Sequence, residues 1–155
     1  MAIASALPRL APTSRLNVAR ELFARMDSSG DKYLELMTWY GSADFADPPQ
    51  LLSLIRSVEA TPRLTRFAAR RLMQLKTRHN SVAALLTEAT DERLRAILEG
   101  MLEGISGQLN PAIPNGWEEL SHVLMASRSA EVRRMTQQLS AAYGDTNALE
   151  ALRAL

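Results

Sequence analysis

The chain has 155 residues, which is enough for one domain that buries about 70% of the surface exposed by its unfolded form. Its 18 basic and 17 acidic residues give a formal net charge of +1, so an electrostatic partner must be selected by a local patch rather than by a global field. The absence of cysteine excludes disulfides, thiolate metal sites and a cysteine nucleophile.

The first 12 residues are predicted to form a flexible arm. They do not resemble a signal peptide, because Pro8 and Pro12 interrupt them and no charged region precedes the apolar residues. No apolar run approaches the ~18 residues of a membrane-spanning helix, so the sequence predicts a soluble chain and does not specify a compartment. Residues 13–155 are predicted to form a single domain, with the first helix beginning after Thr13 or Ser14.

Amphipathic segments follow in chain order, and each opens with a capping residue or a turn. Asp31 is expected to cap a helix that carries Trp39, and Gly41 is expected to loosen or end it. Asp47 and Pro48 are expected to start the next helix. The short apolar segments are LNVARELFARM, PQLLSLIRSV, SVAALLTEA and WEELSHVLMA, and the longer ones that follow them are DKYLELMTWYG, TPRLTRFAARRL, DERLRAILEGML and SAEVRRMTQQLS.

Residues 61–78, TPRLTRFAARRLMQLKTR, form the longest unambiguous amphipathic helix that the sequence predicts. Thr61 is a suitable N-cap, and Pro62 stands at the first helical position, where its missing N–H has no cost. Arg71 falls inside the apolar stripe, where a lone cation is costly to desolvate, so we expect an acidic or carbonyl partner for it. The stripe consists of Leu64, Phe67, Ala68, Leu72 and Leu75, and the candidate partners of Arg71 are Asp44 and Glu35, with Glu99 and Glu103 as alternatives.

Hydrophobic residues with the same local setting recur along the chain. The recurrence, at intervals of 30, 30 and 38 residues, involves Leu34, Leu64, Leu94 and Val132. Two helices in roughly 30 to 40 residues are typical of a helical solenoid, because one pair cannot cover its own apolar face. The sequence therefore predicts an all-α fold, a HEAT-like α-solenoid (α-α superhelix) of about four to five helix pairs, with a loop insertion at residues 107–114.

Two surfaces are candidates for interaction. The last segment, NALEALRAL, is predicted to expose an apolar face, because no helix follows to cover Leu149, Leu152 and Leu155. Such an uncapped repeat needs another repeat or a partner subunit. The second surface is the polar face of the helix at residues 61–78, and it consists of Arg63, Arg66, Arg70 and Arg78.

No residue pattern indicates catalysis or a bound cofactor. The serines lack the Gly-x-Ser-x-Gly context of an activated nucleophile. Glu118 and His122 lie four residues apart on one predicted helix, but such a pair is far more often a solvated surface pair than a metal site. Trp117, which follows Pro114 and Gly116, is expected to begin that helix and to pack its indole as an anchor over the preceding loop.

Several short motifs in order resemble one protein family. They are LELMTWYGSADF, RFAARRL, ILEGMLEGISGQ, the Pro-Gly-Trp pattern at 114–117 and EVRRMTQQLSAAYGD. Together, over about residues 31–155, they resemble the HEAT-like helical segment of large bacterial membrane-bound dehydrogenase-type proteins. In that family the segment accompanies a sugar-dehydrogenase-like β-propeller and a c-type haem domain with a CxxCH motif. The resemblance implies an exported or periplasmic parent protein whose dehydrogenase and haem chemistry lies in domains that this sequence does not contain.

The sequence thus predicts a non-catalytic scaffold or protein-interaction module, whose partner is another domain, another subunit or a second copy of the chain. No catalytic residue, metal or cofactor is expected. The alternative is a nucleic-acid-binding HEAT-like repeat protein, because residues 61–78 contain six basic residues and no acidic one. Against this alternative, no aromatic residue lies among the exposed basic positions to stack on a base.

Overall fold

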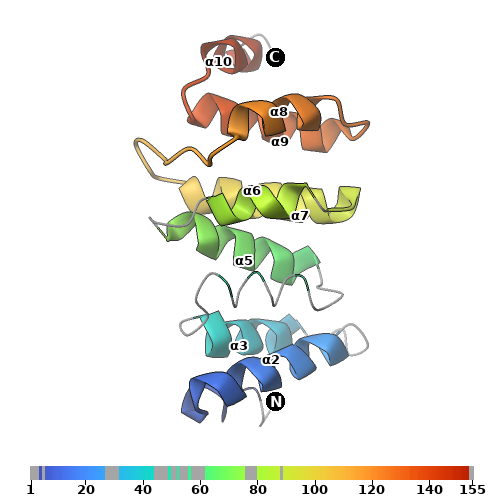
Figure 1. Cartoon of the computed structure of the whole chain (residues 1–155), viewed down its shortest axis with the longest axis vertical. Coiled ribbons are helices and arrows are strands. Elements are labelled where there is room, and N and C mark those ends of the chain that lie inside the picture. The colour runs from blue at the N-terminus through green and yellow to red at the C-terminus, as the bar shows by residue number, and fades with distance from the viewer. Residues whose placement is uncertain are drawn as a thin grey trace. The chain divides into compact units, whose positions relative to one another are not determined.

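The computed structural model describes residues 4, 6–26, 32–43, 49, 52, 56, 62–75, 80–87 and 89–153. Every regular element among these residues is a helix, which confirms the predicted all-α class. The elements are η1 (Leu7–Arg9), α2 (Pro12–Met26), α3 (Lys32–Ala43), α5 (Pro62–Gln74), α6 (Asn80–Leu86), α7 (Asp91–Ile105), α8 (Trp117–Met125), α9 (Ala130–Ala142) and α10 (Thr146–Arg153) (Figure 1).

The chain divides into two compact units, Met1–Ala68 and Ala69–Leu155, and the division falls within α5. In the described part of the chain, no helix combines the length and the apolar character needed to cross a membrane. The helix start predicted at Asp47 and Pro48 lies outside the described residues.

In the first unit, η1 packs against both α2 and α3. The sequence predicts a loose arm over residues 1–12, but Leu7 is fully buried and α2 already begins at Pro12. The close approach depends on Gly41, because a Cβ there would lie 2.7 Å from the Leu7 Cβ. Gly41 therefore makes room for η1 and does not end the helix, since α3 continues to Ala43.

A buried arginine holds the segment between η1 and α2. The Arg15 guanidinium donates from Nη2 to the carbonyl oxygens of Pro8, at 2.6 Å, and Leu10, at 2.9 Å. These charge-assisted bonds satisfy carbonyl groups that precede the first regular turn of α2. The aromatic ring of Trp39 on α3 lies 5.7 Å from the ring of Phe67, and Trp39 is buried in the core. Tyr40, by contrast, is exposed.

In the second unit, α9 lies at the centre, in contact with α7, α8 and α10. Its inward residues Val132, Met135 and Leu139 recur every three or four positions, which is the spacing that places side chains on one helix face. At the other end of this unit, Gly104 of α7 allows a close approach to α5. A Cβ at Gly104 would lie 2.6 Å from the Met73 Cβ and 2.8 Å from a backbone carbonyl oxygen.

The recurring hydrophobic residues occupy equivalent places in the long helices. They stand at the third position of α3, α5 and α9 and at the fourth position of α7. In two of these helices the threonine four residues later donates its hydroxyl back to the recurring residue: Thr38 to the Leu34 carbonyl and Thr136 to the Val132 carbonyl, each at 2.8 Å. The sequence interval therefore corresponds to a repeated position within a helix.

Candidate functional site

The second unit contains a groove with a volume of about 690 Å³. Four parts of the chain contribute to it: the loop before α8, one face of α8, the end of α9 and the start of α10. This volume falls within the range of about 300–1,000 Å³ that is typical of ligand sites. The apolar side of the groove consists of Ile113, Trp117, Met125, Tyr143 and Ala148.

The helix α8 starts where it does because of the loop geometry before it. Gly116 has φ +73°, a left-handed conformation that glycine adopts without a Cβ clash, and it occupies the N-cap position. The Trp117 amide then donates to the Pro114 carbonyl at 3.1 Å. These local contacts confirm the predicted helix start and bring the indole of Trp117 to the first turn.

Three faces of α8 have different surroundings. Trp117 and Leu124, seven positions apart and so on one face, are buried. A second face, which carries Glu118, Ser121, His122 and Met125, lines the groove. Val123 lies on a third face, is 70% exposed and does not line the groove. Because an α-helix turns about 100° per residue, a nine-residue helix can serve the core and the groove at once.

The floor of the groove is built from Trp117 and two residues of the α9 end. The indole Nε1–H donates to Ser140 Oγ at 3.2 Å. The Trp117 and Tyr143 rings meet edge to face, with centroids 5.2 Å apart and planes at 78°. This geometry is the favoured one for an aromatic pair. The indole therefore anchors α8 on α9. The sequence predicts only that it packs over the preceding loop.

The Tyr143 hydroxyl is unusual in its surroundings. Its oxygen is buried, and it has no hydrogen-bond partner within the described part of the chain. Burial raises the pKa of Tyr143, because desolvation disfavours the charged phenolate. A buried hydroxyl without a partner costs free energy, so this group lowers the stability of the folded chain.

The turn from α9 into α10 places the remaining wall. Gly144 has φ +93°, and the Asp145 amide donates to the Ser140 carbonyl while the Gly144 amide donates to the Ala141 carbonyl, each at 3.0 Å. This pair of bonds is a Schellman motif. Asp145 Oδ1 then accepts from the amides of Asn147, at 2.9 Å, and Ala148, at 3.2 Å, and so caps α10.

The electrostatic character of the groove is acidic. Glu118 and Asp145 bring two carboxylates to its lining. The lining includes no lysine or arginine, and His122 is its only basic side chain among the described residues. The remaining polar lining residues, Ser121, Gln137, Ser140 and Asn147, are uncharged.

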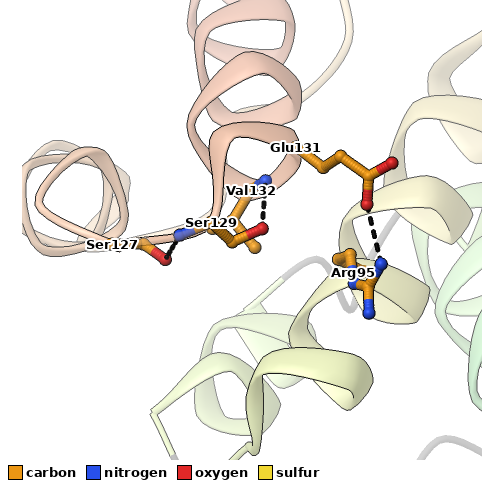
Figure 2. A network of polar contacts seen from close by, with 5 residues as sticks. All are labelled: Arg95, Ser127, Ser129, Glu131 and Val132. Carbon is orange, nitrogen blue, oxygen red and sulfur yellow. Dashed lines mark hydrogen bonds and ion pairs between the residues drawn. The ribbon is translucent and has the colours of Figure 1, made fainter.

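A polar network fixes the other end of α9 (Figure 2). Ser129 is the N-cap, and its Oγ accepts from the Val132 amide at 3.4 Å, while the Ser129 amide donates to Ser127 Oγ at 3.1 Å. Arg95 of α7 donates to Glu131 of α9 at 2.7 Å, and this contact raises the pKa of Arg95. The pair is solvent-exposed, so it contributes to the alignment of α7 and α9 more than to stability.

The predicted basic surface is not a free cationic face. Arg63 and Arg66 are partly buried, and the Arg66 guanidinium lies 5.8 Å from the centroid of the Phe67 ring. Arg70 forms an ion pair with Glu103 at 3.7 Å. Arg78 lies outside the described residues. Glu103, an alternative partner of Arg71 in the sequence analysis, is therefore engaged by Arg70.

Arg71 is partly exposed, which differs from the predicted buried cation. The buried face of α5 includes Thr65, Ala69 and Met73 and is centred away from the predicted stripe, so Arg71 lies at its edge and reaches solvent. Asp44 and the side chain of Glu35, the two predicted partners of Arg71, lie outside the described part of the structure.

The predicted apolar surface at the C-terminal segment is described only at Leu149, which is 36% exposed; the Leu152 side chain and Leu155 lie outside the described residues.

Sequence reasoning missed Ile113, Met125 and Tyr143 as groove residues. A signal existed for α8, because Val123, Leu124 and Met125 are consecutive apolar residues and one buried face cannot hold all three.

The chemistry of the groove favours binding. Glu118 and His122 both line it, but no group of three or more potential metal ligands occurs among the described residues. The Ser121 hydroxyl donates to the Glu118 carbonyl of its own helix at 2.8 Å, so its proton is directed to the backbone and not to a base.

Comparison of the chain with protein-family models, with curated proteins and with solved structures gives no match.

Proposed function

We propose that the chain is a non-catalytic protein-interaction module that binds a segment of a partner protein in the groove between α8, α9 and α10. The observation that carries this proposal is the groove itself, which has an aromatic floor and exposed apolar side chains at its edge. Ile113 and Met125 are 54% and 42% exposed. Large apolar side chains that line a concave surface and remain open to solvent are typical of binding sites.

The repeated placement of Leu34, Leu64, Leu94 and Val132 supports a second part of the proposal. We infer that the helices belong to a HEAT-like repeat, in which a series of helix pairs presents one binding surface. The resemblance to the helical segment of dehydrogenase-type proteins fits the same proposal, with another domain or subunit as the partner.

The nucleic-acid alternative has less support. A phosphate-binding surface needs several cations that are free to replace counterions. Here Arg70 is engaged by Glu103, and Arg66 lies beside an aromatic ring. The groove, moreover, is lined by carboxylates, which repel phosphate.

A peptide selection tests the proposed function. The full chain is immobilised and probed with a random 12-residue peptide library displayed on phage, and enriched peptides are synthesised and titrated. Binding should be lost in Met125→Arg, which removes an apolar contact and places a cation in the groove, and retained in Val123→Arg, which places the same charge on the opposite side of α8. If no peptide is enriched, or if both variants bind equally well, the proposed function is wrong.

The two tryptophans report where a peptide binds. The indole signals in a ¹H–¹⁵N spectrum come from Trp117 in the groove and from Trp39 in the first unit. A peptide that occupies the groove should shift the Trp117 signal and leave the Trp39 signal unchanged. The Trp39 signal reports on the first unit only, so the folding of each variant is checked by its helical circular dichroism at 222 nm.

A further inference from the structure

We propose that the groove selects a partner segment in which a large apolar side chain stands next to an arginine or lysine. The inference rests on the proposed function and specifies which chemistry the groove recognises. It follows from the two kinds of residue that meet there, an apolar floor and a rim whose described residues include two carboxylates and no lysine or arginine.

The apolar part of the ligand is set by the floor. Trp117 is only 6% exposed and is fixed by its bond to Ser140 and its contact with the Tyr143 ring. Trp117 therefore forms a fixed base that loses little side-chain entropy on binding, and the exposed Ile113 side chain supplies apolar contact area beside it. Met125 borders it with a flexible side chain that adapts to different apolar partners. Leucine, methionine, phenylalanine or tryptophan would fit this surface.

The basic part of the ligand is set by charge complementarity. Glu118 reaches the groove from α8, and Asp145 reaches it from the start of α10. The two carboxylates therefore approach a bound segment from two different helices. A ligand cation would meet attraction from both, whereas a ligand carboxylate would meet repulsion, and such repulsion is an effective means of excluding wrong partners.

The partner is a separate protein. An exposed arginine of a second copy of the chain would offer the same chemistry, so self-association must be measured. Sedimentation of the full chain should show a monomer. A dimer that Met125→Arg separates would show that a second copy fills the groove, and it would overturn the proposal.

A charge reversal tests the proposed selectivity. Asp145 is unsuitable because it caps α10, so the variant is Glu118→Arg. Its matched control is Glu119→Arg, because Glu119 also lies in the first turn of α8, is exposed and does not line the groove. Both variants change the net charge of the protein by the same amount and have the same relation to the helix dipole. Glu118→Gln, a milder change, serves if the reversal impairs folding.

The phage selection is repeated with each variant, and the peptides selected by the wild type are titrated. Wild type and Glu119→Arg should enrich arginine or lysine beside a large apolar residue, and Glu118→Arg should shift the selection toward aspartate or glutamate. A basic peptide should bind Glu118→Arg on the order of tenfold more weakly, and Glu119→Arg less than about threefold more weakly, since Glu119 is exposed, does not line the groove and is screened by solvent and salt.

Two results would overturn the inference while leaving the proposed function intact. One is a groove-bound peptide, sensitive to Met125→Arg, with no preference for basic residues. The other is a basic preference that Glu118→Arg and Glu119→Arg change equally. The failure of any peptide to depend on Met125 would instead contradict the proposed function.

Discussion

The substitution Tyr143→Phe should stabilise the protein, which is opposite to the usual effect of removing a polar group from a packed aromatic ring. The hydroxyl oxygen is buried without a partner in the described part of the chain, whereas the ring itself packs edge to face on Trp117. Phenylalanine keeps the ring contact and removes only the oxygen. In the unfolded chain the substitution removes a hydroxyl that is hydrogen-bonded to water, whereas in the folded chain it removes one that has no hydrogen bond. The substitution therefore raises the free energy of the unfolded state relative to the folded state.

The magnitude follows from two opposing terms. Burial of a hydroxyl without a hydrogen bond costs about 1–3 kcal/mol. The oxygen also makes dispersion contacts, each contributing about 0.1–0.2 kcal/mol, and these are lost in the variant. The expected net gain is therefore about 1 kcal/mol in the free energy of unfolding, which corresponds to about 2–4 °C in Tm for a protein of this size.

The gain should increase at alkaline pH. Burial raises the pKa of Tyr143, so above its ordinary value of about 10 the unfolded chain releases the phenolic proton while the folded chain retains it. The unfolded state then binds fewer protons, and the wild type loses up to about 1.4 kcal/mol for each pH unit above pH 10. The contribution is constant below about pH 9. Tyr143→Phe removes this loss, so the difference between the two proteins should widen from pH 9 to pH 11.

Urea unfolding followed by circular dichroism at 222 nm measures both effects at pH 7 and through the alkaline range. The control is Tyr33→Phe, because Tyr33 is 74% exposed and its substitution should change the free energy of unfolding by less than about 0.5 kcal/mol. A destabilisation of Tyr143→Phe by more than about 0.5 kcal/mol at pH 7 would show that the hydroxyl has a partner and would refute the reasoning.

Substitutions at three further positions test the packing and capping of the second unit and of α5, each by thermal or urea unfolding. Gly104→Ala should destabilise the protein by about 1 kcal/mol. The clash of the added Cβ with Met73 and the backbone costs about 1–3 kcal/mol, and the higher helix propensity of alanine offsets about 1 kcal/mol of it. Equal or higher stability of the variant would contradict the close approach. Ser129→Ala should cost about 1 kcal/mol and Ser129→Gly only a few tenths, because glycine is tolerated at an N-cap; equal losses would argue against the cap. Arg71→Ala should lower the free energy of unfolding by less than about 0.5 kcal/mol, as expected at a partly exposed site. A loss of about 3 kcal/mol would instead support the buried ion pair that the sequence predicts.

The features that sequence reasoning predicted correctly depend on neighbouring residues. Pro62 begins α5 and Trp117 begins α8, because the proline φ and the left-handed glycine at 116 act on the adjacent turn. The last two helices are capped in the same local way, although the sequence analysis singles out neither cap: Ser129 and Asp145 bond to amides two or three residues away. All of these interactions are completed within one helical turn, so the local sequence contains both partners.

The burial of α5 shows what a helical wheel cannot determine. Apolar character alone centres the predicted stripe near Leu64, which is indeed buried. The structure also buries Thr65 and Ala69, which are small enough to let another element approach, and it leaves Arg71 partly exposed. Whether a small residue faces the core depends on which element packs against it. Met73 of α5, for example, packs closely on Gly104, which lies about 30 positions later in the chain.

The sequence by itself determined the helical class, the starts of several helices and the equivalent placement of the recurring hydrophobic residues, because periodicity and capping act over a few positions. Only the tertiary structure brought the carboxylates of Glu118 and Asp145 to the same groove and left the Tyr143 hydroxyl without a partner. These outcomes depend on how α8 and α10 pack on α9, and packing geometry arises from the complementary shapes of side chains that are distant in sequence.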